Sequence, residues 1–160
     1  MEGLDVAKLI EGVGIPESAV RVCDQYRNIM GYADTVMAAL YSAMDVLSSV
    51  TMGEGFGVPI IEAQACGTPV IVGGWTAMPE LVGSGLVIAP EDAERMFTPM
   101  GAYQYLPRME AVLDAYEQAY AVRGDERVRT EARDFALAYD ADTVTHDYWR
   151  PVLAEIEQRI

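Results

Sequence analysis

Two glutamates, Glu54 and Glu62, stand on either side of the segment of this chain that is best suited to bind a ligand. The segment starts with the glycine-rich run Gly53–Gly57, and Pro59 follows at a position that favours the first turn of a helix. Glycine lets the backbone approach a ligand closely, and the free amides and dipole of a helix start favour an anion. We therefore expect an anion-binding loop that leads into a helix near Val58.

The two carboxylates indicate that the ligand carries hydroxyl groups as well as an anion. An ionised carboxylate only accepts hydrogen bonds, and it has room for two hydroxyl donors. A ribose offers two adjacent hydroxyls and a sugar offers several. Glu54 lies on the loop, and Glu62 lies about one turn inside the predicted helix. The pair predicts a ligand that combines a phosphate with sugar hydroxyls, although a solvent-facing helix glutamate and simple turn glycines are the alternative interpretation.

Predicted strands and helices alternate around this loop. Thr68–Val72 and Gly85–Ile88 are apolar without alternation, as in buried parallel strands, and a short strand is predicted at Asp45–Leu47 and its neighbours. Val58–Cys66 is predicted as a helix that Gly67 ends. The sequence thus predicts an α/β fold: a single doubly wound, Rossmann-like domain with a parallel sheet and a helical C-terminal tail. In such sheets, the loops at the carboxyl ends of the strands bind ligands.

The remaining elements are predicted from shorter patterns. The alternation of Ala19–Cys23 indicates a strand, and Arg95–Tyr105 indicates a β-hairpin. Helical periodicity is found in Asp5–Gly12, Ala33–Met44, Pro107–Arg123, Asp125–Tyr139 and Thr143–Ile160, with Asp142 as the N-cap of the last. Residues 107–160 form the predicted tail. Trp75, next to two glycines at the end of a strand, is the aromatic side chain singled out as a candidate to line a cleft.

An ordered series of motifs resembles the retaining glycosyltransferases of the GT-B fold, family 4, also called the group 1 transferases. Glu54 and Glu62 enclose seven residues, as in the E-x7-E motif of that family. Three further stretches are similar to family motifs: LYSAMDV at Leu40–Val46, EAQACGTPVI at Glu62–Ile71 and MPELV at Met78–Val82. The resemblance covers Ala19–Val122, so the chain looks like one half of a GT-B architecture.

The resemblance implies transfer of a sugar, with retention, from a nucleotide diphosphate sugar to an unknown acceptor. The donor substrate would be a UDP- or GDP-sugar, and no cofactor is expected. Glu54 is the candidate catalytic residue and would contact the hydroxyls of the donor sugar, while Glu62 would accept from the ribose hydroxyls. The backbone amides that would cradle the sugar and the distal phosphate are those of Gly55, Phe56, Gly57 and Val58. The loop Asp24–Tyr26 is where the family holds the base.

The resemblance also implies that no metal takes part. Asp140-Ala141-Asp142 mimics the DxD of metal-dependent transferases, but its place at a predicted helix start favours capping. No Cys/His cluster indicates a metal site either.

A GT-B enzyme has two doubly wound domains, and 160 residues are enough for one. We expect residues 1–160 to be the C-terminal, nucleotide-sugar-binding domain, truncated at its N-terminal side. The basic residues that the family places near the diphosphate have no match, because Lys8 lies in the first helix, and Arg21 and Arg27 lack motif support. The isolated chain is therefore expected to bind its donor weakly unless a complementary N-terminal domain or chain completes it. The alternative is a non-catalytic module that binds nucleotide sugar or self-associates as a homo-oligomer.

The composition limits the class of protein further. Hydrophobic residues make up 51% and charged residues 22%, which is typical of a soluble globular protein. The formal net charge of -14 argues against nucleic acid as a partner. The longest uncharged stretch, Ala63–Pro79, is broken by glycines and a proline, so no transmembrane segment is expected. The start of the chain, Met1–Asp5, is acidic, unlike a secretory signal, which favours a cytoplasmic location.

Overall fold

The computed structural model describes residues 5–159, and its contacts divide the chain into two compact units, Met1–Asp34 and Thr35–Ile160. The first unit holds α1 (Val6–Gly12), a 3-10 helix (Glu17–Ala19) and α2 (Gln25–Met30). The helix predicted over Asp5–Gly12 is confirmed, with the side chain of Asp5 accepting from the amide of Lys8 as its N-cap.

The strand predicted at Ala19–Cys23 is wrong. Ala19 ends the 3-10 helix, and Val20–Cys23 follow as backbone that pairs with no strand of the described sheets. Val20 has extended dihedral angles, φ -113° and ψ 139°, and Val22 is 74% exposed. Alternating apolar residues favour extended backbone, but a strand also needs a neighbour that supplies ladder hydrogen bonds.

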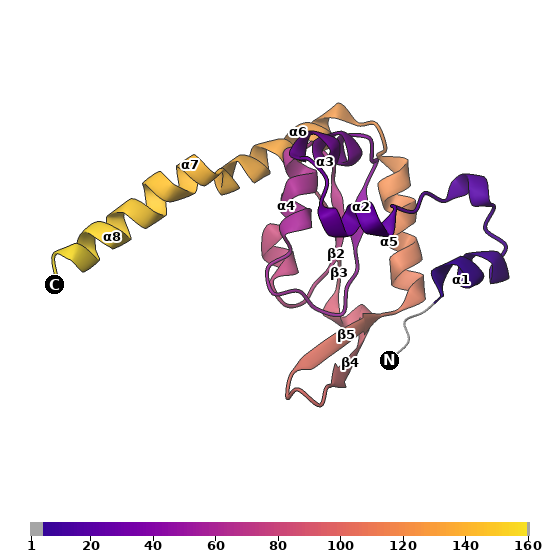
Figure 1. Cartoon of the computed structure of the whole chain (residues 1–160). Helices are drawn as coiled ribbons and strands as arrows, with labels where there is room; N and C mark the ends of the chain where they lie inside the picture. The colour runs from indigo at the N-terminus through magenta and orange to yellow at the C-terminus, as the bar shows by residue number, and fades with distance from the viewer. Residues whose placement is uncertain (1–4, 160) are drawn as a thin grey trace. The chain divides into compact units, whose positions relative to one another are not determined.

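The second unit is built on a parallel sheet of three strands in the order β1-β2-β3. The strands are β1 (Leu47–Ser49), β2 (Val70–Gly73) and β3 (Gly85–Ile88). Val70 pairs with Leu47 on one side and with Gly85 on the other, which makes β2 the central strand. Figure 1 shows α4 (Val58–Ala65) and α5 (Met109–Ala121) on opposite sides of this sheet. The predicted α/β class with a parallel, Rossmann-like sheet is confirmed.

The other elements of this unit surround the sheet or extend from it. They are α3 (Asp34–Ser42), two 3-10 helices (Met78–Leu81 and Pro90–Asp92), the antiparallel hairpin of β4 (Ala93–Phe97) and β5 (Tyr103–Pro107), α6 (Glu126–Ala136), a 3-10 turn (Leu137–Tyr139), α7 (Ala141–Val144), a π-helical turn (Thr145–Trp149) and α8 (Arg150–Glu157). The predicted hairpin is confirmed, as are helices in the tail; Ile160, the last residue of the predicted tail, lies outside the described residues. None of the helices within residues 5–159 has the length and apolar character needed to cross a membrane.

The predicted N-cap of the last helical run is wrong by two residues. The side chain of Asp140, not that of Asp142, accepts from the amides of Asp142 and Thr143 at 3.1 Å each. An N-cap carboxylate satisfies amides two and three residues ahead of it, so Asp142 falls inside the first turn. The capping interpretation of this acidic pair is confirmed for Asp140.

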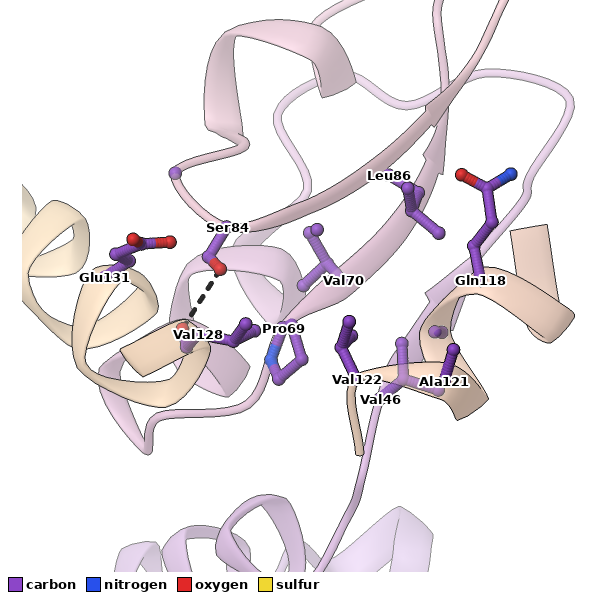
Figure 2. Close-up of a pocket in the computed structure, with 13 residues that line it drawn as sticks. Val46, Pro69, Val70, Ser84, Leu86, Gln118, Ala121, Val122, Val128 and Glu131 are labelled. Atoms are coloured by element: carbon purple, nitrogen blue, oxygen red, sulfur yellow. Dashed lines mark hydrogen bonds between the residues drawn. The ribbon is translucent and has the colours of Figure 1, made fainter. Parts of the chain in front are cut away.

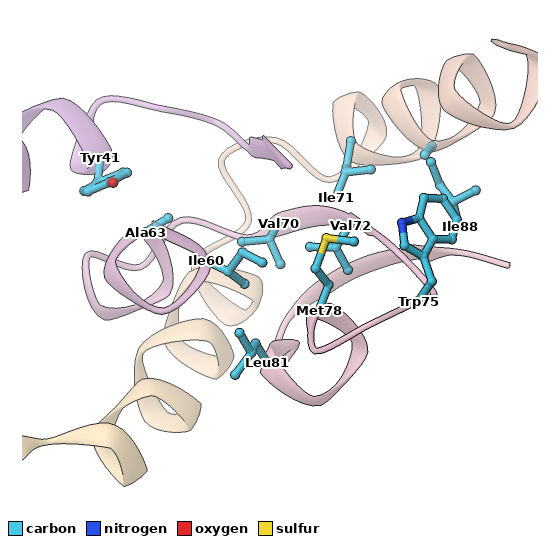
Figure 3. Close-up of a cluster of buried hydrophobic side chains, with 11 residues drawn as sticks. Tyr41, Ile60, Ala63, Val70, Ile71, Val72, Trp75, Met78, Leu81 and Ile88 are labelled. Carbon is cyan, nitrogen blue, oxygen red and sulfur yellow. The ribbon is translucent and has the colours of Figure 1, made fainter. Parts of the chain in front are cut away.

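The hydrophobic core lies between the sheet, α4 and the turn after β2. Every residue of β2 is buried, and Ile60 and Ala63 of α4 face Val70 and the 3-10 helix that contains Met78 (Figure 3). A fully buried side chain of this kind contributes about 1.5–3 kcal/mol through apolar area removed from water. The buried face of α4 thereby fixes which of its residues remain available to a ligand.

One buried polar side chain, Gln64, joins α4 to the chain on the far side of the core. Its Nε2 donates to the carbonyls of Ile60 (3.0 Å) and Leu81 (2.6 Å), and its Oε1 accepts from the amides of Gly83 (2.8 Å) and Ser84 (3.1 Å). These four bonds use both donors and both lone pairs of the amide. Gln64 has no exposed surface, so the network is fully satisfied without water.

We expect Gln64→Leu to lower the free energy of unfolding by about 3 kcal/mol, because it leaves buried backbone amides and a carbonyl without partners. Urea unfolding followed by circular dichroism measures this loss. The matched control is Gln118→Leu on α5, where the exposed side chain only bonds the carbonyl of Asp114 in its own helix. It should change stability by less than about 0.5 kcal/mol. Equal losses in the two variants would contradict the role given to Gln64.

Candidate functional site

Two loops meet at the carboxyl edge of the sheet. The loop over residues 50–57 connects the end of β1 to the start of α4, and the loop over residues 74–77 follows β2. Because β1 and β2 are parallel neighbours, their carboxyl ends lie at the same edge. This edge is where α/β sheets bind their ligands, and it carries Glu54 and the glycine-rich run, as the sequence predicts.

The start of α4 has the geometry of an open helix N-terminus. Gly57 is its N-cap, in the left-handed conformation (φ 101°, ψ 48°), and Pro59 lies in the first turn as predicted. Within the described residues, no side-chain hydrogen bond caps this helix. Pro59 has no amide hydrogen, and the amide of Ile60 donates to the carbonyl of Gly57 at 2.9 Å. The first turn of α4 therefore offers an anion the amide of Val58 and the positive end of the helix dipole.

The structure requires glycine at position 57 but not at position 55. A Cβ at Gly57 would lie 2.8 Å from Cδ1 of Ile60 and 3.3 Å from Cδ1 of Leu81, so the fold itself requires glycine there. A Cβ at Gly55 would meet nothing within 4 Å, and Gly55 does not have a positive φ. The turn interpretation thus accounts for Gly57, while the protein's own packing gives no reason for glycine at position 55.

The loop that carries Glu54 is tied to the loop after β2. The amide of Glu54 donates to Oγ1 of Thr76 at 3.1 Å, and the same hydroxyl donates to the carbonyl of Trp75 at 2.7 Å. Thr76 has a φ of 56° and is the one non-glycine residue with positive φ in the part of the chain that the structure describes. A β-branched residue in this region is strained, and such strain persists where the surroundings hold it and often accompanies function.

Trp75 does not line a cleft, in contrast to its interpretation from the sequence. It is 4% exposed, its Nε1 donates to the carbonyl of Thr51 at 2.9 Å, and its ring stacks on Tyr105 with centroids 5.3 Å apart. The amide of Tyr105 in turn donates to the carbonyl of Met52 at 3.1 Å. Trp75 therefore holds the loop over residues 50–57, which we call the glutamate loop, against the β4–β5 hairpin. The sequence could not show this, because the residues in contact are distant in the chain.

Glu62 lies on the exposed side of α4, where Tyr41 of α3 holds it. The hydroxyl of Tyr41 donates to Oε2 of Glu62 at 2.9 Å, and the tyrosine itself is only 6% exposed. Burial, and then the hydrogen bond to Glu62 and the charge of that carboxylate, raise the pKa of Tyr41 to about 12. The sequence places Tyr41 in the motif LYSAMDV, and the motif alone does not indicate a role for it. The available signal was that a tyrosine on an apolar helix face needs a partner for its hydroxyl.

The residues predicted to hold the base lie in the other unit. Asp24 is the N-cap of α2, where its side chain accepts from the amide of Arg27 at 2.9 Å, and Tyr26 is 72% exposed. Of the basic residues considered for the diphosphate, Lys8 pairs with Asp5 at 3.3 Å and Arg21 donates to carbonyls of its own loop. The role of Asp24–Tyr26 stays a prediction.

A separate crevice of about 540 Å³ lies at the opposite, amino edge of the sheet (Figure 2). The first residues of β2 and β3, Val70 and Gly85, line it together with parts of α5 and α6. Ser84 in its wall donates to the carbonyl of Val128 at 3.0 Å. Its lining includes neither Glu54 nor Glu62, so the candidate site is the open carboxyl edge rather than this hollow.

The fold and the carboxyl-edge loop define an α/β protein with a helix start open to an anionic ligand. The family model of the "Glycosyl transferases group 1" matches residues 8–101, which include every candidate site residue described above. The chain belongs to this family of glycosyltransferases.

Individual relatives agree with this family. The chain is 42% identical over 67 residues to O-antigen chain mannosyltransferase B of Escherichia coli, an alignment that covers 41% of this chain and 18% of that protein. It is 34% identical over 96 residues (58% and 22%) to D-inositol 3-phosphate glycosyltransferase of Saccharomonospora viridis. It is 30% identical over 105 residues (63% and 24%) to MMP alpha-(1->4)-mannosyltransferase of Mycolicibacterium hassiacum. The chain thus spans about a fifth of the length of these curated relatives.

Substitution of the two loop glycines, Gly55 and Gly57, by alanine should change the free energy of unfolding by different amounts. We expect Gly57→Ala to cost about 2 kcal/mol or more, because it forces a left-handed backbone on alanine and a contact with Ile60. Gly55→Ala should leave the free energy of unfolding unchanged or raise it by up to about 1 kcal/mol, because the added methyl enters open space and restricts the unfolded chain. Thermal unfolding of the two variants tests this. A large loss for Gly55→Ala would show that the described loop geometry is incorrect.

Proposed function

We propose that this chain binds the donor of a retaining glycosyltransferase, a nucleotide diphosphate sugar. The observation that carries the proposal is the arrangement around α4: an uncapped helix start, with Glu54 on the loop before it and Glu62 one turn inside it, in a chain of this family. Glu54 and Glu62 are then the two acidic residues of the E-x7-E motif. The sugar would pass to an acceptor that a part of the enzyme outside this chain recognises.

The loop before α4 is suited to stabilise the nucleoside diphosphate as it leaves the sugar. Transfer breaks the bond between the anomeric carbon of the sugar and the phosphate oxygen, and the bond to the acceptor oxygen replaces it. The nucleoside diphosphate leaves with developing negative charge, which fixed backbone donors stabilise. The amides of Gly55, Phe56, Gly57 and Val58, together with the dipole of α4, are the donors for the distal phosphate and the sugar.

The two carboxylates divide the hydroxyl groups between them. The resemblance to the E-x7-E motif assigns Glu54, on the loop, to the hydroxyls of the transferred sugar. It assigns Glu62, on the exposed face of α4, to the ribose hydroxyls. A hydrogen bond to a charged carboxylate is worth about 1.5–3 kcal/mol, roughly 10- to 100-fold in affinity, so each contact is measurable.

Positive charge for the diphosphate has to come from beyond the loop. The chain carries a formal charge of -14, and the loop over residues 50–57 has no lysine or arginine. Three arginines of the second unit make contacts elsewhere: Arg95 over Tyr103, Arg123 over Tyr120, and Arg129 on carbonyls at and after the end of α3. We propose that a complementary N-terminal domain or chain supplies both the cations and the acceptor site. The isolated chain then binds its donor weakly and transfers little or no sugar.

The second candidate function is a non-catalytic module that self-associates. The observation that favours it is the apolar surface of the helical tail, where Tyr148, Trp149 and Val152 are 66%, 59% and 51% exposed. Exposed apolar surface of this kind promotes association. The net charge opposes it, because like-charged copies repel one another.

Calorimetry with UDP- and GDP-sugars tests the donor-binding proposal. We expect saturable binding of one of the two classes, with Glu54→Ala and Glu62→Ala each weakening it about 10-fold or more. The control is Glu110→Ala, an exposed glutamate in the first turn of α5, which should bind as the wild type does. A chain that binds no nucleotide sugar and sediments as a stable oligomer supports the self-associating module instead.

Gly55→Ala gives an independent test of the phosphate cradle. Because the protein leaves open space at this position, a methyl group there can only interfere with something that approaches from outside. We expect roughly 10-fold weaker binding of UDP or GDP with unchanged stability. Unchanged affinity would mean that the phosphates do not contact this loop.

A further inference from the structure

We propose that Tyr41 is a positioning residue for the donor: its hydroxyl holds the carboxylate of Glu62 in the orientation that accepts the ribose hydroxyls. The inference rests on the proposed function, and it adds a residue to the site that is 21 positions away in the chain. Tyr41 does not contact the donor itself. It acts through one oxygen of Glu62, Oε2, and leaves Oε1 for the ligand.

The packing and hydrogen bonds around Tyr41 hold its hydroxyl, a hydrogen-bond donor, in one position. Its ring belongs to the buried core cluster, in which Figure 3 shows it beside Ala63 of α4. Its carbonyl accepts from Oγ1 of the fully buried Thr68 at 2.6 Å. The guanidinium of Arg129 donates to the carbonyl of Ser42 at 3.0 Å and so holds the end of α3 that carries the tyrosine.

Glu62 needs such a support, because it is exposed on a helix surface. A free glutamate side chain samples several rotamers, and a ligand that orders it loses affinity. The bond from Tyr41 orders the carboxylate before the ligand arrives. The phenol of Tyr41 is protonated in the neutral range, as any tyrosine is, and so remains a hydrogen-bond donor; burial and the carboxylate of Glu62 raise its pKa further, to about 12.

Packing alone does not explain this arrangement. Tyr41 is 6% exposed, and phenylalanine would fill the space of its ring without a polar group to satisfy. The hydroxyl instead reaches the one carboxylate of α4 that the site uses. A purely structural tyrosine and a positioning tyrosine differ in one measurable respect: only the second has an effect that depends on the hydroxyls of the ligand.

The test compares two ligands in two variants. Calorimetry measures binding of UDP and GDP, and of their 2′,3′-dideoxy analogues, to the wild-type chain and to Tyr41→Phe. We expect Tyr41→Phe to weaken binding of the ribose nucleotide by roughly 3- to 10-fold and binding of the dideoxy analogue by less than about 2-fold. Tyr116→Phe, at an exposed tyrosine of α5, is the control and should alter neither.

The outcomes separate the two proposals. Absence of wild-type binding overturns the proposed function. Equal wild-type binding of the ribose and dideoxy ligands overturns the ribose contact of Glu62 and the positioning role, but not donor binding by the phosphate loop. Wild-type binding that prefers ribose, with no loss or with equal losses for both ligands in Tyr41→Phe, overturns the positioning role alone. A loss confined to the ribose ligand supports both.

A measurement without ligand checks the hydrogen bond itself. Tyrosine labelled with ¹³C and followed by NMR should show one signal, absent in Tyr41→Phe, that titrates well above the others. Glu62→Gln removes both the charge and the carboxylate acceptor, so it should shift this titration to lower pH. An unchanged titration in Glu62→Gln would show that the side chains of Tyr41 and Glu62 do not interact. This result would not depend on whether the chain binds a nucleotide sugar.

Discussion

The candidate site depends on how α4 is held, because this one helix carries both the free amide of Val58 and the carboxylate of Glu62. Apolar contacts bury one face of α4 against β2, but such contacts alone tolerate sliding and rotation. The four hydrogen bonds of Gln64 remove that freedom, since each has a defined direction and none can be replaced by water. A buried amide in the core therefore sets the geometry of an exposed ligand site.

The glutamate loop in front of α4 is positioned by a second set of contacts, from segments that sequence proximity does not connect. Trp75 bonds the carbonyl of Thr51 and stacks on Tyr105, and the strained Thr76 accepts from the amide of Glu54. The two hydrogen bonds join the loops that follow β1 and β2, and the parallel pairing of these strands brings the loops together. The stack on Tyr105 adds a contact to β5 of the hairpin. The strain at Thr76 is maintained because its hydroxyl is bonded on both sides.

The sequence predicted a structural element correctly where the residues of that element determine its conformation by themselves. The position of β3 and the start of α4 could be predicted because a continuous apolar run, or a glycine two residues before a proline, reports the conformation of its own residues. The burial predicted for β3 was wrong, because β3 is an edge strand of the three-stranded sheet and Val87 is 46% exposed. The strand predicted at Ala19–Cys23 failed because a strand is defined by its partner, which alternation does not supply. Trp75 was misinterpreted and Tyr41 was overlooked for the same reason: the partners of their polar atoms, Thr51 and Glu62, are more than twenty residues away.

The two carboxylates of the site are supported unequally, and this bears on what the chain can do by itself. Glu62 is ordered through its side chain by Tyr41, whereas the recorded contact of Glu54 is through its backbone amide. An ordered carboxylate binds its ligand with less loss of entropy than a free one. In the proposed site, the ribose end is thus more preorganised than the sugar end. A partner that completes the site, as proposed above, would therefore contribute most at Glu54, where the side chain is not held by a hydrogen bond among the described residues.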